Sequence, residues 1–288
     1  MVGSLVTPLV TPYNPHNRLD FTSLKFLVEH LVRTRTKTVV LGTTVGEGDQ
    51  LSLIERQKLI DRVLRYGLEP LKVFVALGTN TLDDWEAEWK LIRNLPVHGL
   101  YLTYEKLLEA GILKGIKWDT LSSLKASLMI NYPVLLDLRG FEPTIHDHIE
   151  EFLPWLGMLD IVGIITDDLS LIHELTRIDK RTFQIFVHDI ARLIPLLQAG
   201  GDGMFSAFNH LYGETFHTLI QLVKSGAREE AGLLYDANVK KLRQIDSEDP
   251  SIIKAVLNHL GYRVGGVRRP RQSLSPKKRD ALVKKLVR

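Results

Sequence analysis

The chain is predicted to fold as a closed (β/α)8 TIM barrel with a C-terminal helical extension. Eight short apolar runs, rich in Val, Ile and Leu, alternate with segments of helical periodicity. Such continuous runs are typical of strands that are buried on both faces of a parallel sheet. The repeat of about 25–30 residues gives roughly 210 residues in all, which is a usual size for this barrel. A doubly wound open sheet is the main alternative, but it normally has fewer strands, and no glycine fingerprint follows the first run.

Each predicted strand leads directly into polar residues or glycine. The first run ends in a proline-punctuated loop, which marks the end of a strand. The sixth passes from the apolar Ile161–Ile165 into Thr166 and two aspartates. In chain order, the predicted strands lie within Ser4–Tyr13, Thr38–Leu41, Lys72–Ala76, Gly99–Leu102, Pro133–Leu136, Leu159–Asp168, Phe183–Val187 and Met204–Ser206.

Capping residues indicate where the helices between these strands begin. Asp20 is predicted to cap a helix whose apolar face starts at Phe21. Ser52 and Glu55 have the spacing of a capping box, which opens a helix to about Arg65. Further helices are predicted at Trp85–Arg93, Asp119–Met129 and Ile145–Leu156, with a short one after the sixth strand.

Two regions are predicted along the chain. Residues 1–208 form the barrel, and residues 209–288 form a helical region that contains the last barrel helix and an extension. Ser275 and Pro276 mark the start of the final helix, because serine is a good cap and proline suits the first helical position.

Composition limits the classes of function. The 288 residues hold no cysteine, which excludes disulfides, cysteine nucleophiles and thiolate metal sites. No apolar run reaches the roughly 18–20 residues of a membrane helix, and the N-terminus lacks the pattern of a secretory signal. The net charge of +3 is too small to indicate nucleic-acid binding. We therefore expect a cytoplasmic protein with no nucleic-acid or membrane partner and no cofactor.

In a parallel barrel, polar groups at the C-terminal strand ends meet in one pocket. Schiff-base aldol chemistry at such a pocket requires a lysine whose amine is held neutral by burial. The candidate groups at these ends are Thr43, Thr44, Glu47, Thr79, Tyr104, Asp137, Arg139, Thr166, Asp167, His188, Asp189, Ser206 and Asn209.

Several motifs resemble the dihydrodipicolinate synthase and N-acetylneuraminate lyase family in order and spacing along the whole chain. The closing motifs also resemble its archaeal sugar-acid aldolase branch. The motifs are Thr11-Pro12 with Asp20, Gly42-Thr43-Thr44 with Gly46-Glu47 and Leu51-Ser52, Tyr104 with Gly111, Gly200-Gly201-Asp202-Gly203 with Ser206 and Asn209, and Gly261-Tyr262, Arg269-Pro270 and Leu274.

The resemblance implies a barrel with a C-terminal helical region, assembled as a homodimer or as a homotetramer of tight dimers. It also implies a Schiff base between pyruvate, or a related 2-oxo acid, and a lysine at the end of strand six. A tyrosine at the end of strand five would transfer protons, and the double-threonine loop would hold the substrate carboxylate. A second tyrosine, after strand four, would complete a relay across the dimer.

Carried over position by position, the family pattern is only partly met. Thr43, Thr44 and Tyr104 match it. Asp137 stands at the tyrosine position of strand five, and Ile165 stands at the lysine position of strand six. Ile165 has no nucleophilic atom, so this position is not able to form a Schiff base.

Two further positions depart from the family pattern. Val187 and His188 replace the small Ser-Gly pair of strand seven, and Val45 is an extra residue in the threonine loop. Other lysines are poorly placed to substitute, because Lys37 and Lys72 precede their strands and face the opposite end of the barrel. Lys106 lies in a loop beyond Tyr104 and would need an unusual inward reach.

Three hypotheses follow for the function. The first is Schiff-base chemistry, which the loss of the lysine disfavours. The second is an active lyase that uses Asp137 and His188 as acid and base, with Tyr104 as a further candidate. In its metal-assisted form, as a lyase or hydrolase, Asp137, Asp167, His188 and Asp189 would gather around a divalent ion. In this second case the alternative roles of Asp167, Asp168 and Asp189 are helix caps.

The third hypothesis is favoured: a family member that has a degenerate active site and keeps a pocket for a small 2-oxo acid or sugar acid. Several family positions are changed together, which is more easily explained by lost selection on one reaction than by a single compensated exchange. Thr43, Thr44, Arg139 and Ser206 are the predicted substrate-binding residues, and Arg139 would pair with a carboxylate through its planar guanidinium. The other interpretation of Arg139 is a solvated loop residue.

Overall fold

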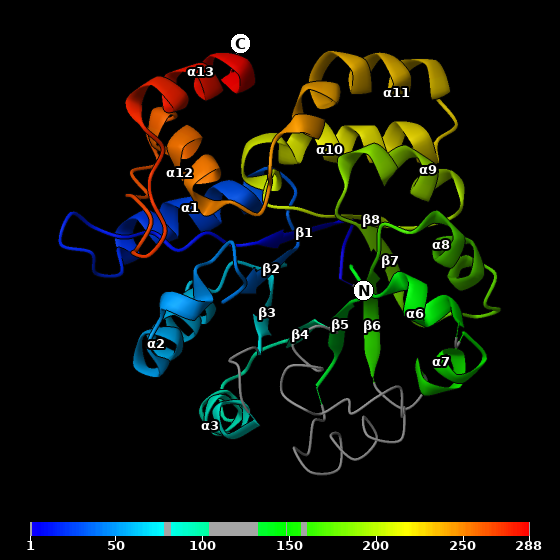
Figure 1. Cartoon of the computed structure of the whole chain (residues 1–288), viewed down its shortest axis with the longest axis horizontal. Coiled ribbons are helices and arrows are strands. Elements are labelled where there is room, and N and C mark those ends of the chain that lie inside the picture. Colours follow the sequence, from blue (N-terminus) through cyan, green and yellow to red (C-terminus); the bar gives the residue numbers. More distant parts are fainter. Residues whose placement is uncertain (1, 78–81, 104–131, 148, 157–159, 288) are drawn as a thin grey trace.

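The computed structural model describes residues 2–77, 82–103, 132–147, 149–156 and 160–287. Eight parallel strands close into a barrel in which β8 pairs with β1 (Figure 1). This confirms the predicted (β/α)8 fold. The strands are β1 (Leu5–Pro8), β2 (Thr38–Leu41), β3 (Lys72–Ala76), β4 (Gly99–Thr103), β5 (Val134–Asp137), β6 (Ile161–Ile165), β7 (Gln184–Val187) and β8 (Gly203–Phe205).

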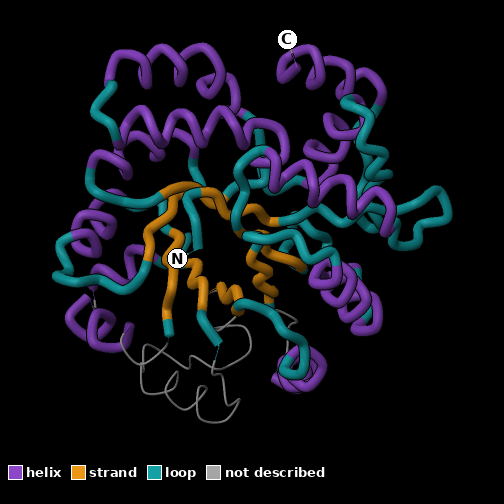
Figure 2. The backbone as a smooth tube through the Cα atoms, turned by 180° about the vertical axis from the view of Figure 1, so that it is seen from behind, coloured by secondary structure: helices purple, strands orange, loops and turns teal. Residues whose placement is uncertain are grey.

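Helices surround the strands, as the view from behind shows (Figure 2). Asp20 accepts hydrogen bonds from Thr22 N and Ser23 N at the start of the first helix, as predicted. The capping box of Ser52 and Glu55 is also confirmed. The helices between the strands are α1 (Phe21–Arg33), α2 (Leu53–Arg65), α3 (Leu82–Ile92), α6 (Glu142–Asp147), α7 (Ile149–Leu156), α8 (Leu169–Thr176), the 3-10 turn η2 (Ile190–Arg192) and α9 (Leu193–Gln198).

The predicted helix over Ile145–Leu156 corresponds to α6 and α7, and its described residues are helical. Helix α6 already begins at Glu142, and Pro143 lies in its first turn, where the missing N–H of proline has no partner to lose. The predicted helix over Asp119–Met129 lies outside the described residues.

After β8 the chain is mainly helical, with a non-helical segment before α12 (residues 245–249) and a longer one between α12 and α13. Figure 1 shows α11 lying over α10 and α13 lying over α12, on the side away from the strands, and each of these pairs is in contact. The elements are α10 (Asn209–Lys224), α11 (Arg228–Leu234), the π-helical turn η3 (Tyr235–Val239), the 3-10 turn η4 (Lys240–Gln244), α12 (Pro250–His259) and α13 (Pro276–Val287). In the described part of the chain, no helix combines the length and the hydropathy of a membrane span.

Side chains fill the interior of the barrel in alternation with those that face the helices. Ile165 belongs to the interior cluster, while its neighbour Ile164 belongs to the outer core. Gly163 is the next inward position of β6, and a Cβ there would lie 2.6 Å from Leu135 Cδ2 and 2.9 Å from Phe186 Cε2. The interior cluster comprises Val2, Val6, Val40, Phe74, Ala76, Tyr101, Leu135, Ile165, Phe186 and Phe205.

A buried ion pair ties the loop after β2 to the C-terminal region. Lys254 Nζ in α12 donates to Glu47 Oε1 at 2.5 Å and to Gly266 O at 2.8 Å. Glu47 Oε2 accepts from Arg268 N at 2.7 Å. Burial lowers the pKa of Lys254 to about 8, and the Glu47 carboxylate opposes that shift. Since Glu47 and Lys254 are 0% and 1% exposed, neither charge has water as an alternative partner.

Removal of Lys254 tests the importance of this pair. We expect Lys254→Met to lower the free energy of unfolding by about 3 kcal/mol, because it leaves the buried Glu47 carboxylate without its cation. Denaturant unfolding measures this change. The control is Lys240→Met, whose exposed ion pair with Asp236 is expected to contribute at most about 0.5 kcal/mol. An equal effect of the two substitutions would contradict the prediction.

Buried His210 makes the stability depend on pH. Its Nδ1 donates to Ala207 O at 2.8 Å, and burial lowers its pKa to about 4. The unfolded chain takes up this proton near pH 6.5 and the folded chain only near pH 4. The contribution of neutral His210 to the free energy of unfolding is therefore fully present above pH 6.5. It decreases by ~3 kcal/mol as the pH falls towards 4.

Unfolding free energies measured between pH 7 and pH 4.5 test this expectation. The slope is expected to flatten in His210→Gln. It should stay unchanged in His16→Gln, which alters an exposed histidine. A slope that is the same in the wild type and in His210→Gln would show that another group is responsible.

Candidate functional site

A cavity of about 140 Å³ lies at the C-terminal ends of the strands. This is the end of a (β/α)8 barrel at which active sites are built. Its walls come from the ends of β1 to β4, from the residues after β5, from β8 and from the segment that precedes α12. The lining residues are Pro8, Gly42, Thr43, Thr44, Val45, Ala76, Leu77, Tyr101, Thr103, Arg139, Phe205 and Glu248.

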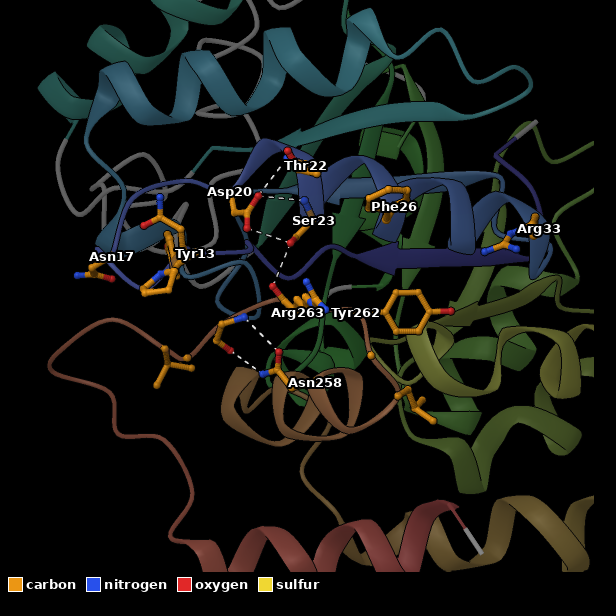
Figure 3. A pocket seen from close by; sticks show the side chains of 17 residues that line it. Tyr13, Asn17, Asp20, Thr22, Ser23, Phe26, Arg33, Asn258, Tyr262 and Arg263 are labelled. Atoms are coloured by element: carbon orange, nitrogen blue, oxygen red, sulfur yellow. Dashed lines mark hydrogen bonds between the residues drawn. The ribbon is translucent and has the colours of Figure 1, made fainter.

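A larger cavity, of about 1040 Å³, lies away from the strand ends, beside α1 and the segment after α12 (Figure 3). Several of its polar groups already have structural partners. Asp20 caps α1, and the Ser23 hydroxyl lies 3.0 Å from Arg263 O. Asn258 exchanges two hydrogen bonds with the backbone of Gly265. The smaller cavity at the barrel mouth is therefore the better candidate site, because the strand-end groups converge there.

Two stacked aromatic rings form part of the wall of this cavity. The rings of Tyr101 and Phe205 are parallel within 2°, with 5.2 Å between their centroids. The guanidinium carbon of Arg139 lies 5.8 Å from the centroid of Phe205. Ile165 is 0% exposed and does not line the cavity; it packs in the interior cluster and pairs in register with Asp137 and Phe186.

An ion pair between Asp137 and Arg139 occupies the end of β5. Arg139 Nη2 donates to Asp137 Oδ2 at 2.7 Å, and Arg139 Nε lies 3.0 and 3.1 Å from the two carboxylate oxygens. The Tyr101 hydroxyl donates to the same carboxylate at 2.5 Å. Burial and the charge of Asp137 raise the pKa of Tyr101, which keeps its phenol protonated. Burial disfavours the charge of Arg139, but Asp137 outweighs it and raises the pKa of Arg139.

A second carboxylate reaches the same guanidinium. Glu248 Oε1 lies 2.9 Å from Arg139 Nη2, and the Glu248 side chain is 41% exposed, whereas that of Asp137 is 3% exposed. Asp137, Arg139 and Glu248 together carry one excess negative charge. Among the described lining residues Arg139 supplies the one guanidinium, and it is already shared by two acids.

His188 follows β7 and supports the segment that carries Glu248. Its Nε2 lies 2.9 Å from Ser247 Oγ, and burial lowers its pKa to about 4, so the ring is neutral at pH 7. Its Nδ1 lies 4.0 Å from Asp167 Oδ2. Asp167 Oδ1 accepts hydrogen bonds at 2.8 Å from the backbone N–H groups of His188 and Asp189, while burial raises the pKa of Asp167.

These residues are ordered like a Ser-His-Asp triad, but the geometry does not support acyl transfer. The distance of 4.0 Å between Asp167 and His188 is too long for a hydrogen bond. Ser247 is 6% exposed, and neither Ser247 nor His188 lines the cavity. The contact between Ser247 and His188 instead attaches the segment before α12 to the residues that follow β7.

A buried ion pair that was not predicted from the sequence lies against the loop after β2, which carries Thr43 and Thr44. Arg56 of α2 forms an ion pair with Glu88 of α3 and donates from Nη2 to Ala76 O at 2.5 Å. A Cβ at Gly42 would lie 2.8 Å from Arg56 Nη2, so glycine allows the loop to approach this side chain. The signal was present, because Arg56 falls on the apolar face of α2 with Leu59 and other buried residues.

The structure brings some of the predicted site residues together and separates others. Thr43, Thr44 and Arg139 line the cavity. Asp137 lies behind Arg139. Ser206 is fully buried, and its Oγ accepts a hydrogen bond from Phe208 N at 3.2 Å.

Some predicted groups are placed by other interactions. Asp168 and Asp189 cap α8 and η2, which confirms those cap assignments. Asn209 donates to Val6 O and Thr7 Oγ1 at the side of β1. Tyr104, Thr79 and Lys106 lie outside the described residues.

The described residues offer little for metal-assisted chemistry. They contain no group of three or more acidic or histidine side chains arranged to hold a metal ion. Asp137 is paired with Arg139, and Asp189 is committed to its cap. The lining of the cavity contains no lysine within the described ranges. Sequence reasoning missed Tyr101, Phe205 and Glu248, because it considered only residues that follow the barrel strands.

Comparisons with known proteins place the chain in a family. It is 24% identical over 295 residues to the 4-hydroxy-tetrahydrodipicolinate synthase of Enterococcus faecalis, covering 99% of this chain and 98% of the relative. A lysine-bound dihydrodipicolinate synthase structure from Cyanidioschyzon merolae superposes with a TM-score of 0.83 at 21% identity, covering 99% and 97% of the two chains. A pyruvate complex from Acinetobacter baumannii gives 0.79 at 18% identity, covering 99% and 98%. These structural matches establish the fold. The model of the dihydrodipicolinate synthetase family matches residues 1–95 and 157–288, and the chain belongs to that family.

Proposed function

We propose that this protein binds a small 2-oxo acid or sugar acid at the barrel mouth and does not carry out Schiff-base aldol chemistry. The observation that carries the proposal is Ile165. The family resemblance puts the reactive lysine at the inward-facing end of β6, and here that position is held by an alkyl side chain with 0% exposure. An isoleucine offers neither a nucleophile nor a proton carrier.

Retention of an acid-binding pocket is supported by the residues around the cavity. Thr43, Thr44 and Arg139 surround a volume of about 140 Å³, which suits a small ligand better than a large one. The A. baumannii relative was solved with pyruvate, so pyruvate is the first 2-oxo acid to test. Arg139 is the group that would pair with the carboxylate of the ligand.

A lyase that uses Asp137 and His188 as acid and base is not favoured. Asp137 is held by Arg139 and Tyr101, and His188 does not line the cavity. We also propose, from the family resemblance, that the chain assembles as a homodimer or homotetramer. A monomer in sedimentation would contradict that assembly and would remove the role proposed for Tyr104 in a neighbouring pocket.

Borohydride trapping tests the absence of Schiff-base chemistry. We expect no reduced pyruvyl group on the wild-type chain after incubation with pyruvate and borohydride, as read by intact mass. Ile165→Lys is the informative comparison, because it places an amine at the inward end of β6. Its melting temperature shows whether this variant folds. Ile165→Met is the control for the altered packing. An adduct on the wild-type protein would overturn the proposal and show that another lysine has become reactive.

Binding of pyruvate tests the role of Arg139. We expect Arg139→Met to weaken the affinity, measured by calorimetry, by at least about tenfold, because a hydrogen bond to a charged group contributes about 1.5 kcal/mol or more. The same change should lower stability by about 3 kcal/mol, since it leaves buried Asp137 without its cation.

Arg181→Met is the matched control for Arg139→Met. Arg181 pairs with Asp202 at 2.9 Å, at the opposite end of the barrel, and both side chains are 20% exposed. It should lower stability without changing the affinity for pyruvate. Equal affinities of the Arg139→Met and wild-type proteins would show that the acid binds elsewhere.

A further inference from the structure

We infer that Glu248 is an internal competitor for the acid-binding site: its carboxylate occupies the Arg139 guanidinium, and an incoming acid must displace it. The inference rests on the proposed function, because it assumes that Arg139 receives the ligand. Glu248 lies on the segment before α12, more than 100 residues from Arg139 in sequence, and it lines the same cavity. It is therefore a determinant of affinity for anionic ligands.

The geometry indicates which of the two carboxylates gives way. Asp137 is 3% exposed and makes several hydrogen bonds with Arg139 as well as one with Tyr101. Glu248 makes one contact with Arg139, at 2.9 Å, its Oε1 lies 3.6 Å from Nε2 of the neutral His188, and its side chain is 41% exposed. Water is available to solvate the Glu248 carboxylate once it leaves, whereas Asp137 would lose partners that no solvent replaces. A ligand carboxylate therefore exchanges with Glu248.

The backbone around Glu248 is held on both sides, so that its side chain is presented to the cavity. Glu248 N donates to Asp246 Oδ1 at 2.8 Å, and Ser247 Oγ lies 2.9 Å from His188 Nε2. Asp249 then caps α12 by accepting from Ser251 N at 2.8 Å. Exchange with a ligand consequently requires only rotation of the Glu248 side chain and no movement of the main chain.

Electrostatics set the direction of the effect. With Asp137 and Glu248 both ionised, two negative charges face the one positive charge of Arg139. Asp246, near His188, and Asp167, near Arg139, add further negative charge. His188 contributes no positive charge at pH 7, since its pKa is lowered to about 4 by burial. Removal of the Glu248 charge frees one face of the guanidinium and reduces the repulsion of an anionic ligand.

Glu248→Gln is the test, because it removes the charge and keeps the shape. Calorimetry with pyruvate is expected to give an affinity about fivefold higher than that of the wild type. This factor corresponds to ~1 kcal/mol, the contribution of a partly exposed ion pair. The gain should shrink as ionic strength rises. In the Arg139→Met background the same substitution should change the affinity less than twofold, because the guanidinium for which the two acids compete is absent.

Glu174→Gln is the matched control. It makes the same chemical change at an exposed residue of α8 whose ion-pair partner is Arg177, and it should leave the affinity unchanged. Measurable and equal affinities of the wild type and Glu248→Gln would overturn the role of Glu248 and leave the proposed function standing. Absence of pyruvate binding in the wild type, in Glu248→Gln and in Glu174→Gln would overturn both.

Discussion

The Asp137–Arg139 ion pair organises the barrel mouth. Asp137 is nearly inaccessible to water, so its charge is tolerated only because Arg139 and the Tyr101 hydroxyl satisfy it. The same guanidinium lies near Phe205, whose ring stacks on Tyr101. It also pairs with the side chain of Glu248, on the segment that leads into α12. The charge and the shape of the cavity therefore both depend on one cation that follows β5.

A barrel mouth arranged in this way differs chemically from one built around a buried amine. Schiff-base formation requires an amine that loses its proton inside the pocket, whereas Arg139 stays charged because Asp137 raises its pKa. A permanent cation is suited to holding an acid, and it offers no lone pair with which to attack a carbonyl group. Ile165, packed in the interior cluster with Phe186 and Phe205, adds no reactive group to this mouth, which agrees with the proposed binding role.

The sequence predicted the barrel well because strand signals are local. The apolar runs matched six of the eight strands to within one residue and located β1 and β6 inside longer predicted stretches, and Asp20 and Ser52 marked the starts of their helices correctly. Contacts between distant segments carry no such local signal. Glu248 reaches Arg139 from a segment more than 100 residues away. The position of Arg56 on the apolar face of α2 indicates its burial, but not its pairing with Glu88 on another helix. His188 was expected to line the pocket because it follows β7, which ends at Val187. Its ring instead contacts Ser247 and does not line the cavity.

The buried pair of Glu47 and Lys254 affects how the chain folds during synthesis. The two residues are separated by 207 positions, so the loop that carries Thr43 emerges from the ribosome long before its cation exists. Until α12 is made, the Glu47 carboxylate has no Lys254 to pair with, and burial without that partner would be costly. Burial of Glu47 therefore requires the C-terminal region to be in place. A chain that stopped at the end of the barrel strands would retain a hydrated acid where the finished protein has a dry, paired one.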